Sequence, residues 1–159
     1  MKRANLILNN EKYKKVIHAI ELFEIDRKFC RHDISHFMDV ARISYILVLE
    51  NNINIDKEIV YAAALLHDIG RGIQYRDGVP HDLAGLTLAE EILTETGFNE
   101  EEKFTILNAI KYHRSDNKDV NNFNTIFSKS DKLSRNCFNC LEIKNCNWND
   151  EKKNFFIQY

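Results

Sequence analysis

Apolar residues recur every three or four positions along most of the chain, which is the spacing of one helix face. The clearest run covers residues 13–23, and the same spacing follows Asp33 and Asp56, two residues of the type that favours a helix N-terminus. Gly70 and Gly72 are expected to end the third of these segments. The first half of the chain therefore predicts three amphipathic helices.

The second half repeats the pattern after the turn sequence YRDGVP. Helices are expected over about 82–96, 100–113 and 122–133. Asn99 and Glu102 have the spacing of a capping box at the start of the middle one. No stretch alternates apolar and polar residues for long enough to predict a β-strand.

Together these segments predict an all-α fold. At 159 residues the chain is long enough to bury most of its apolar surface in one core. We expect one compact helical bundle of about six to seven helices over residues 1–159, with the tail 147–159 packed as its last helix.

Composition and charge narrow the classes of partner. The chain is 44% hydrophobic and 29% charged, and no apolar run approaches the roughly 20 residues that span a bilayer. The opening MKRANLILNN is too short in its apolar part for a signal sequence. We expect a soluble cytoplasmic protein with no membrane partner. The net charge of −2, with scattered Lys and Arg, argues against double-stranded nucleic acid and favours a small substrate.

The stretch AAALLHDIG places His67 and Asp68 side by side at the end of an apolar run. Burying an unpaired carboxylate and an imidazole costs several kcal/mol, so a folded chain needs partners for both. A bound metal ion would supply them.

Further metal-ligating side chains lie near the ends of the other predicted helices. Our hypothesis is that one ion is held by His36, His67, Asp68 and Asp131, and that Asp68 shares its other oxygen with a second ion held also by His81 and His113. Mixed imidazole and carboxylate ligands suit iron, manganese or zinc.

The order of these residues resembles the HD-domain phosphohydrolase superfamily, and HDIGR resembles its central motif. PHDLAG and AIKYHR carry their histidines where two-metal members carry theirs, and the pattern is similar to the group that cleaves dinucleoside polyphosphates symmetrically. The resemblance covers 36–131, about 60% of the chain. It implies one or two divalent ions and hydrolysis, by metal-activated hydroxide, of a phosphomonoester, phosphodiester or phosphoanhydride bond in a nucleotide or another small phosphate ester.

Such a reaction needs cations near the phosphoryl oxygens. Our candidates for binding phosphate follow predicted ligands closely in the sequence and are Arg71, Arg114 and Lys132. We expect Asp68, Arg71 and Lys132 to act in catalysis. Each of the three cations could instead be a solvated surface charge.

The histidines have alternative interpretations. His36 alone could be a hydrogen-bonded core histidine, and His81 and His113 could bind phosphate beside a single metal. His32 stands four residues before His36, a spacing that can bind zinc, and is a rival ligand. His18 lies outside the motif and is expected to be structural or exposed.

The cysteines form a second candidate site, in the C-terminal segment 137–159. CFNCLEIKNC supplies Cys137, Cys140 and Cys146, and Cys30 is the fourth. Four cysteines would suit structural zinc or an iron–sulfur cluster, and the alternative is a set of reduced thiols in a packing segment.

Two other functions therefore stay open beside the hydrolase. The chain could be a metal- or redox-responsive module that binds a nucleotide with little turnover and senses through a Cys-ligated metal. It could also be a structural helical protein whose histidines are incidental.

Overall fold

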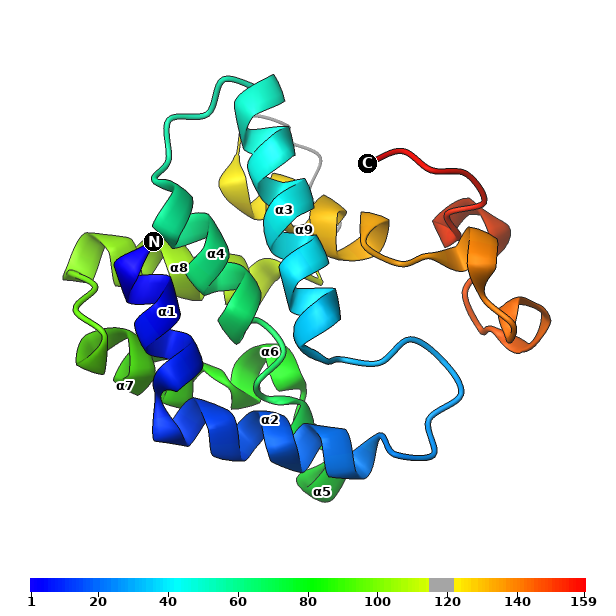
Figure 1. Cartoon of the computed structure of the whole chain (residues 1–159), viewed down its shortest axis with the longest axis horizontal. Helices are drawn as coiled ribbons and strands as arrows, with labels where there is room; N and C mark the ends of the chain where they lie inside the picture. Colours follow the sequence, from blue (N-terminus) through cyan, green and yellow to red (C-terminus); the bar gives the residue numbers. More distant parts are fainter. Residues whose placement is uncertain (115–121) are drawn as a thin grey trace.

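The computed structural model describes residues 1–114 and 122–159, and within these ranges it contains helices and no strand (Figure 1). The predicted all-α fold is confirmed, and seven of the described helices have eight or more residues. The helices are α1 (Lys2–Asn9), α2 (Glu11–Phe23), α3 (Ile34–Glu50), α4 (Lys57–Leu66), α5 (Arg71–Asp77), α6 (His81–Ala84), α7 (Leu86–Glu95), α8 (Glu100–Tyr112) and α9 (Phe123–Leu133), followed by the 3₁₀ turns η1 (Cys137–Asn139), η2 (Ile143–Asn145) and η3 (Asp150–Lys152).

The predicted helix starts are confirmed by their caps. Asp33 accepts a hydrogen bond from the backbone N–H of His36 at 3.0 Å, and Asp56 caps α4 in the same way. Asn99 and Glu102 form both hydrogen bonds of the capping box at the start of α8. Local side-chain chemistry therefore fixes where the helices that carry the site begin.

Two local predictions were wrong. The turn expected between the third and fourth helices contains α5, and the helix expected over 82–96 divides at Gly85 into α6 and α7. At this division the backbone of Gly70 lies against the backbone of His81 and Gly85. A Cβ on Gly70 would lie 2.2 Å from the carbonyl oxygen of His81. Glycine is needed at this contact, which holds the start of α6 against the end of α4.

The predicted last helix was also wrong. The tail forms the turns η2 and η3 with extended chain between and beyond them. Its apolar residues do not share a helix face, and Asn154 instead donates hydrogen bonds to the carbonyl oxygens of Lys132 and Arg135 at 2.8 and 2.9 Å. These two long-range contacts hold the tail against the end of α9.

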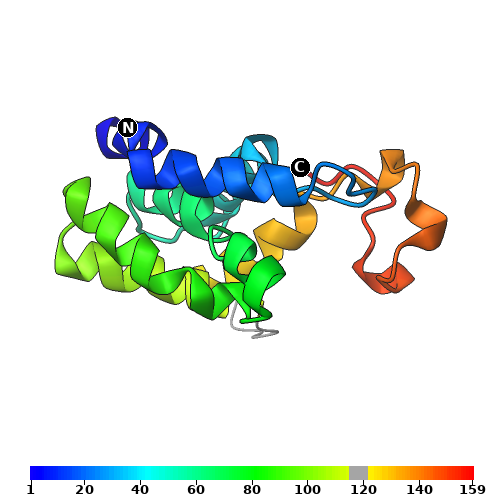
Figure 2. The same ribbon diagram turned by 90° about the horizontal axis from the view of Figure 1, so that it is seen from below.

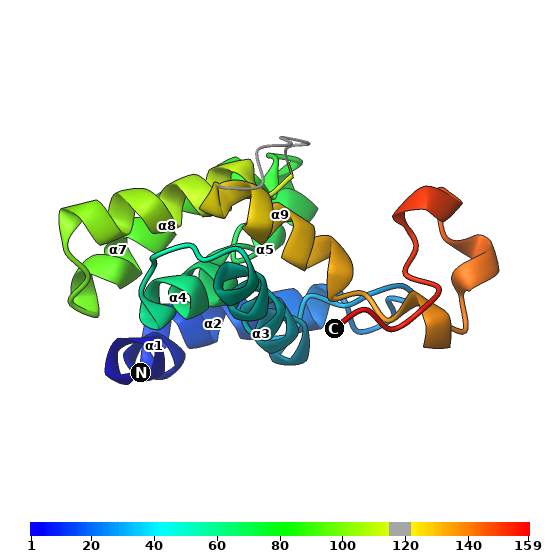
Figure 3. The ribbon, with the colours of Figure 1, turned by 90° about the horizontal axis from the view of Figure 1, so that it is seen from above.

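The bundle has three layers, with α3 and α4 in the middle (Figures 2 and 3). Helices α1 and α2 cover one side of this layer, and α7, α8 and α9 cover the other. The core is made of fully buried side chains from several layers, including Phe37, Leu65, Ile106, Ile110 and Phe127. No helix of the described ranges is long and apolar enough to cross a membrane.

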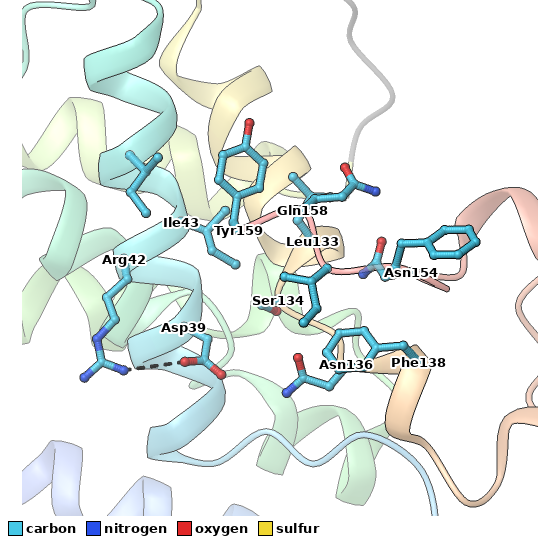
Figure 4. Close-up of a pocket in the computed structure, with 13 residues that line it drawn as sticks. Asp39, Arg42, Ile43, Leu133, Ser134, Asn136, Phe138, Asn154, Gln158 and Tyr159 are labelled. Atoms are coloured by element: carbon cyan, nitrogen blue, oxygen red, sulfur yellow. Dashed lines mark ion pairs between the residues drawn. The ribbon is translucent and has the colours of Figure 1, made fainter.

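The segment after α9 extends away from these layers, toward the same side as the long loop between α2 and α3 (Figures 1 and 3). It then turns back, so that Tyr159 donates a hydrogen bond to Glu50 at 3.1 Å. A pocket of about 360 Å³ lies between this segment and α3 (Figure 4). It is lined by residues such as Ile43, Leu133 and Tyr159, and it is separate from the buried cluster described next.

Candidate metal centre

The six predicted metal ligands meet at the ends of helices inside the bundle. In Figure 1 the lower ends of α3 and α4 lie beside α6. Five of the six side chains are buried and the sixth, Asp131, is 18% exposed. The structure therefore brings together every ligand predicted from the sequence, namely His36, His67, Asp68, His81, His113 and Asp131.

One group forms around the Oδ2 oxygen of Asp68. The Nε2 atom of His67 lies 3.2 Å from it and that of His36 lies 3.7 Å from it. Asp131 closes the group, with its Oδ1 oxygen 3.2 Å from Nε2 of His36 and 3.8 Å from Nε2 of His67. Two atoms that each lie about 2.1 Å from one ion are roughly 3–4 Å apart, so these distances fit a single cation.

A second group forms around the other oxygen of the same carboxylate. Oδ1 of Asp68 lies 3.1 Å from Nε2 of His81 and 3.9 Å from Nε2 of His113. The two imidazole nitrogens are 3.1 Å apart. Asp68 is thus shared between two groups of ligands, in the arrangement predicted from the sequence.

Hydrogen bonds on the far side of each ring fix the tautomers. In all four histidines of these groups Nδ1 faces an oxygen that accepts its proton, which leaves the Nε2 lone pair pointing inward. The pairs are His67 with the Ala64 carbonyl at 2.8 Å, His113 with the Ile110 carbonyl at 2.5 Å, His81 with Oε1 of Gln74 at 2.6 Å, and His36 with the Ser134 hydroxyl at 3.1 Å.

Two of the inward-facing atoms lack a hydrogen-bond partner. In the described part of the chain, Nε2 of His67 and Oδ2 of Asp68 are buried and have no hydrogen-bond partner. The facing nitrogens of His81 and His113 would both present lone pairs at 3.1 Å. Buried carboxylate oxygens and imidazole nitrogens that face one another need a proton or a metal ion between them, and the donor set of nitrogens and oxygens fits divalent metal ions.

The charges of the cluster favour the same conclusion. Burial lowers the pKa of His67, but the carboxylates of Asp68 and Asp131 outweigh it and raise this pKa to about 10. Burial would raise the pKa of both carboxyls, yet contacts with His36 and His67 hold them well below their usual range. In the second group burial lowers the pKa of His81 to about 3. The carboxylates are therefore ionised and the cluster attracts positive charge.

The three predicted phosphate-binding cations differ in position. Arg71 is at the cluster, since its Nε donates to Oδ1 of Asp68 at 2.9 Å. Arg114 is exposed at the surface, 3.5 Å from Asp82. Lys132 is partly buried on α9, next to Asp131 in sequence. Arg71 thus directly contacts the group of predicted ligands.

Sequence reasoning missed Arg135. Its side chain is 7% exposed, and NH2 lies 3.1 Å from Nε2 of His36 and 3.3 Å from Oδ1 of Asp131. The signal was present, because Arg135 follows Asp131 by four residues and therefore lies on the same face of the chain as it leaves α9.

A buried trio beside the cluster was also missed. Glu24, at the end of α2, contacts both His32 and Tyr75. Nε2 of His32 lies 3.8 Å from Oδ2 of Asp68, so the rival ligand considered from its spacing does reach the site. His18 is exposed, as expected.

The cysteines are less closely gathered. Cys137 is buried in η1, Cys140 and Cys146 are partly buried, and Cys30 is on the exposed loop between α2 and α3. Partial desolvation raises the pKa of Cys30, and the nearby thiols of Cys137 and Cys140 raise it further. Within the described ranges, no three cysteine sulfurs lie within 4.8 Å of one another, whereas histidines and Asp68 do so twice. The four-cysteine site stays a prediction.

Comparisons with known proteins agree with the cluster. The model of the HD domain family matches residues 33–136. An uncharacterized protein of Clostridium beijerinckii is 45% identical over 159 residues, which are 100% of both chains. Ribonuclease Y of Mycoplasma mycoides is 28% identical over 120 residues, covering 76% of this chain and 26% of that protein.

A solved structure shows the same fold. It is the crystal structure of a predicted HD superfamily hydrolase from an uncultured Thermotogales bacterium. The TM-score is 0.61 at 23% identity, and the match covers 89% of this chain and 78% of the other. By contrast, this chain spans only about a quarter of the length of the ribonuclease Y that it resembles.

Proposed function

This chain belongs to the HD-domain family, and from that premise we propose that it is a two-metal phosphohydrolase acting on a nucleotide or another small phosphate ester. The family supports metal-dependent phosphohydrolase activity in general, while the number of ions and the substrate are our proposal. The observation that carries it is the carboxylate of Asp68, whose two oxygens face two separate groups of buried imidazoles.

The ligands divide between two ions. His36, His67, Asp131 and Oδ2 of Asp68 would hold one, and His81, His113 and Oδ1 of Asp68 would hold the other. Two divalent cations bound there would supply Lewis acidity, which lowers the pKa of water to near neutrality and offsets charge on a phosphate group.

The chain's own cations then bind the phosphate. Arg71 uses Nε on Asp68, and Arg135 reaches the opposite side of the cluster beside His36 and Asp131. Guanidinium groups present several N–H donors in one plane, a geometry that matches phosphoryl oxygens. We propose that both arginines stabilise the charge on the attacked phosphoryl group, and Lys132 and Arg114 stay predicted contacts for phosphates further along the substrate.

The proposed substrate class follows from the net charge of the chain and from its similarity to known groups of hydrolases. The net charge of −2 and the scattered basic residues favour a small phosphate ester. Within that class, the order of histidines and aspartates is similar to hydrolases of dinucleoside polyphosphates, so we propose a phosphoanhydride of this kind as the first substrate to test. The likeness to ribonuclease Y makes short single-stranded RNA the second.

A reconstitution experiment tests the proposal. Metal-free protein is loaded with Mn²⁺ or Fe²⁺ and offered a panel of dinucleoside polyphosphates, mononucleotides, an aryl phosphate and a short RNA. We expect metal-dependent hydrolysis of a small member of the panel, reduced at least about 100-fold in Asp68→Asn. Asp77→Asn, which changes an exposed carboxylate paired with Arg76, is the matched control and should retain activity.

The same experiment addresses the two alternatives. Metal binding through Asp68 with hydrolysis of no panel member would contradict the hydrolase and favour the nucleotide-binding module. Release of fragments from RNA alone would place the activity with ribonuclease Y. A protein that binds no metal would favour the structural alternative.

A further inference from the structure

The trio of Glu24, His32 and Tyr75 lies outside the six predicted ligands and yet adjoins them. Glu24, at the end of α2, and His32, in the loop before α3, are each 3% exposed. A buried histidine and a buried carboxylate in a connecting loop need a reason, because both side chains lose hydration when they are buried.

Glu24 fixes the orientation of His32. Its Oε2 accepts the backbone N–H of His32 at 2.7 Å, and its Oε1 contacts ring atom Nδ1. Tyr75 donates its hydroxyl to the same Oε1. Both oxygens of Glu24 are therefore used as acceptors, and Nδ1 is the ring nitrogen of His32 that faces this carboxylate. With Nδ1 as the donor, the lone pair of the neutral ring is on Nε2.

That lone pair faces an acceptor. Nε2 of His32 lies 3.8 Å from Oδ2 of Asp68, the buried oxygen that has no hydrogen-bond partner among the described residues. His36 approaches the same oxygen to 3.7 Å with its own Nε2. His32 thus shares with His36 both a ring hydrogen bond that fixes its tautomer and a nitrogen directed at Asp68.

A purely structural role explains only part of this arrangement. The hydrogen bond from the backbone N–H of His32 to Glu24 would already hold the loop against α2. It does not require the ring to direct Nε2 at a carboxylate oxygen 3.8 Å away. Two atoms bound to one ion at about 2.1 Å are separated by roughly 3.0–4.2 Å, and 3.8 Å is within that interval.

We propose that His32 is a further ligand of the cation held by His36, His67, Asp68 and Asp131, and that Glu24 and Tyr75 position its ring. This inference rests on the proposed metal centre and adds to it. A carboxylate that holds the far nitrogen of a ligating histidine is a common support of metal sites, and removing such a support costs about 10–100-fold in affinity.

The test measures metal binding without turnover. Co²⁺ is titrated into metal-free wild-type protein and into His32→Gln, with the affinity and the visible absorption spectrum as readouts. We expect His32→Gln to weaken the first-group site at least about tenfold and to change the spectrum, because a nitrogen ligand is lost. His18→Gln, at an exposed histidine, is the matched control and should match wild type.

Two further variants keep the result interpretable. Glu24→Gln should weaken binding about tenfold by loosening the ring, and Tyr75→Phe should weaken it less. His36→Gln must lose the site, which shows that the titration reports on it. Wild-type affinity and spectrum in His32→Gln, with loss in His36→Gln, would overturn this inference and leave the hydrolase proposal intact. Wild-type protein that binds no Co²⁺ would overturn both.

Discussion

Two regions were selected from the sequence as candidate metal sites, namely the histidine and aspartate cluster and the cysteine segment 137–159. They differ in how deeply their side chains are buried and in how firmly these are held. In the cluster, Asp68 and four histidines are buried at helix ends, with each ring held from behind. In the segment, Cys140 and Cys146 lie beside short 3₁₀ turns and are partly buried.

The difference lies in orientation. Residue type and spacing indicate which atoms are able to bind a metal, but a ligand must also be held with its lone pair toward the ion. The ring of His67 is held by the carbonyl of its own helix, three residues earlier. A site made of all four cysteines would be oriented only by contacts between two irregular stretches of chain. One stretch is the C-terminal segment, and the other is the loop that carries Cys30.

The largest expected effect separates the two regions outright. Asp68→Asn should remove both metal ions of the cluster, because this carboxylate supplies an oxygen to each group. Elemental analysis of the reconstituted variant should show that the metal content falls from two equivalents per chain to none. The control Asp77→Asn should keep both equivalents. Two retained equivalents would mean that the metals lie elsewhere in the chain.

A smaller effect tests the division within the cluster. His81→Gln should remove one equivalent and leave the other, since Nε2 of His81 lies 3.1 Å from Oδ1 of Asp68, the oxygen proposed to bind the second ion. Elemental analysis and calorimetric titration would detect the change. Simultaneous loss of both ions would show that the cluster binds them as a unit.

Metal binding should also depend on pH. Burial lowers the pKa of His67, but Asp68 and Asp131 raise it to about 10, so below that pH a metal must displace the proton. Affinity should therefore increase with pH between about 6 and 9, by up to about tenfold per unit for one displaced proton. His81, with a pKa of about 3, adds no proton. Calorimetry in two buffers counts the protons released, and a pH-independent affinity would be contrary to this account.

The smallest effect is expected at the cysteines. Because no three described sulfurs converge within 4.8 Å, Cys140→Ser should leave the metal content of the cluster and its hydrolytic activity unchanged. Metal analysis and the panel assay measure both quantities. Loss of one zinc or of iron with sulfide in this variant would establish the four-cysteine site and weaken the contrast between the regions.

Sequence reasoning predicted the parts of the fold that are set locally. Asp33, Asp56 and Asn99 cap helices as expected, since the hydrogen bonds involve neighbours in sequence. The break at Gly85 depends on close contact with Gly70, which is fifteen positions away, and the periodic apolar pattern across it resembles one continuous helix.

The residues of the site were likewise predictable where they follow from residue type and spacing. The six predicted ligands were selected from residue types and their order, and Arg135 could have been found from its spacing to Asp131. The contacts that support His32 could not be predicted in this way. Tyr75 donates to Glu24 from 51 residues away, and the packing of α5 on α2 brings the two side chains together. The distance from Asp68 on which the proposed role of His32 rests is likewise a property of the folded chain.

The most direct test of the two-metal centre is an anomalous difference map from crystals grown with Mn²⁺. The account predicts two peaks about 3.5–4 Å apart, one on each side of the Asp68 carboxylate, with His36 and His67 at one and His81 and His113 at the other. A map with no peak at Asp68, or with metal only at the cysteines, would contradict it.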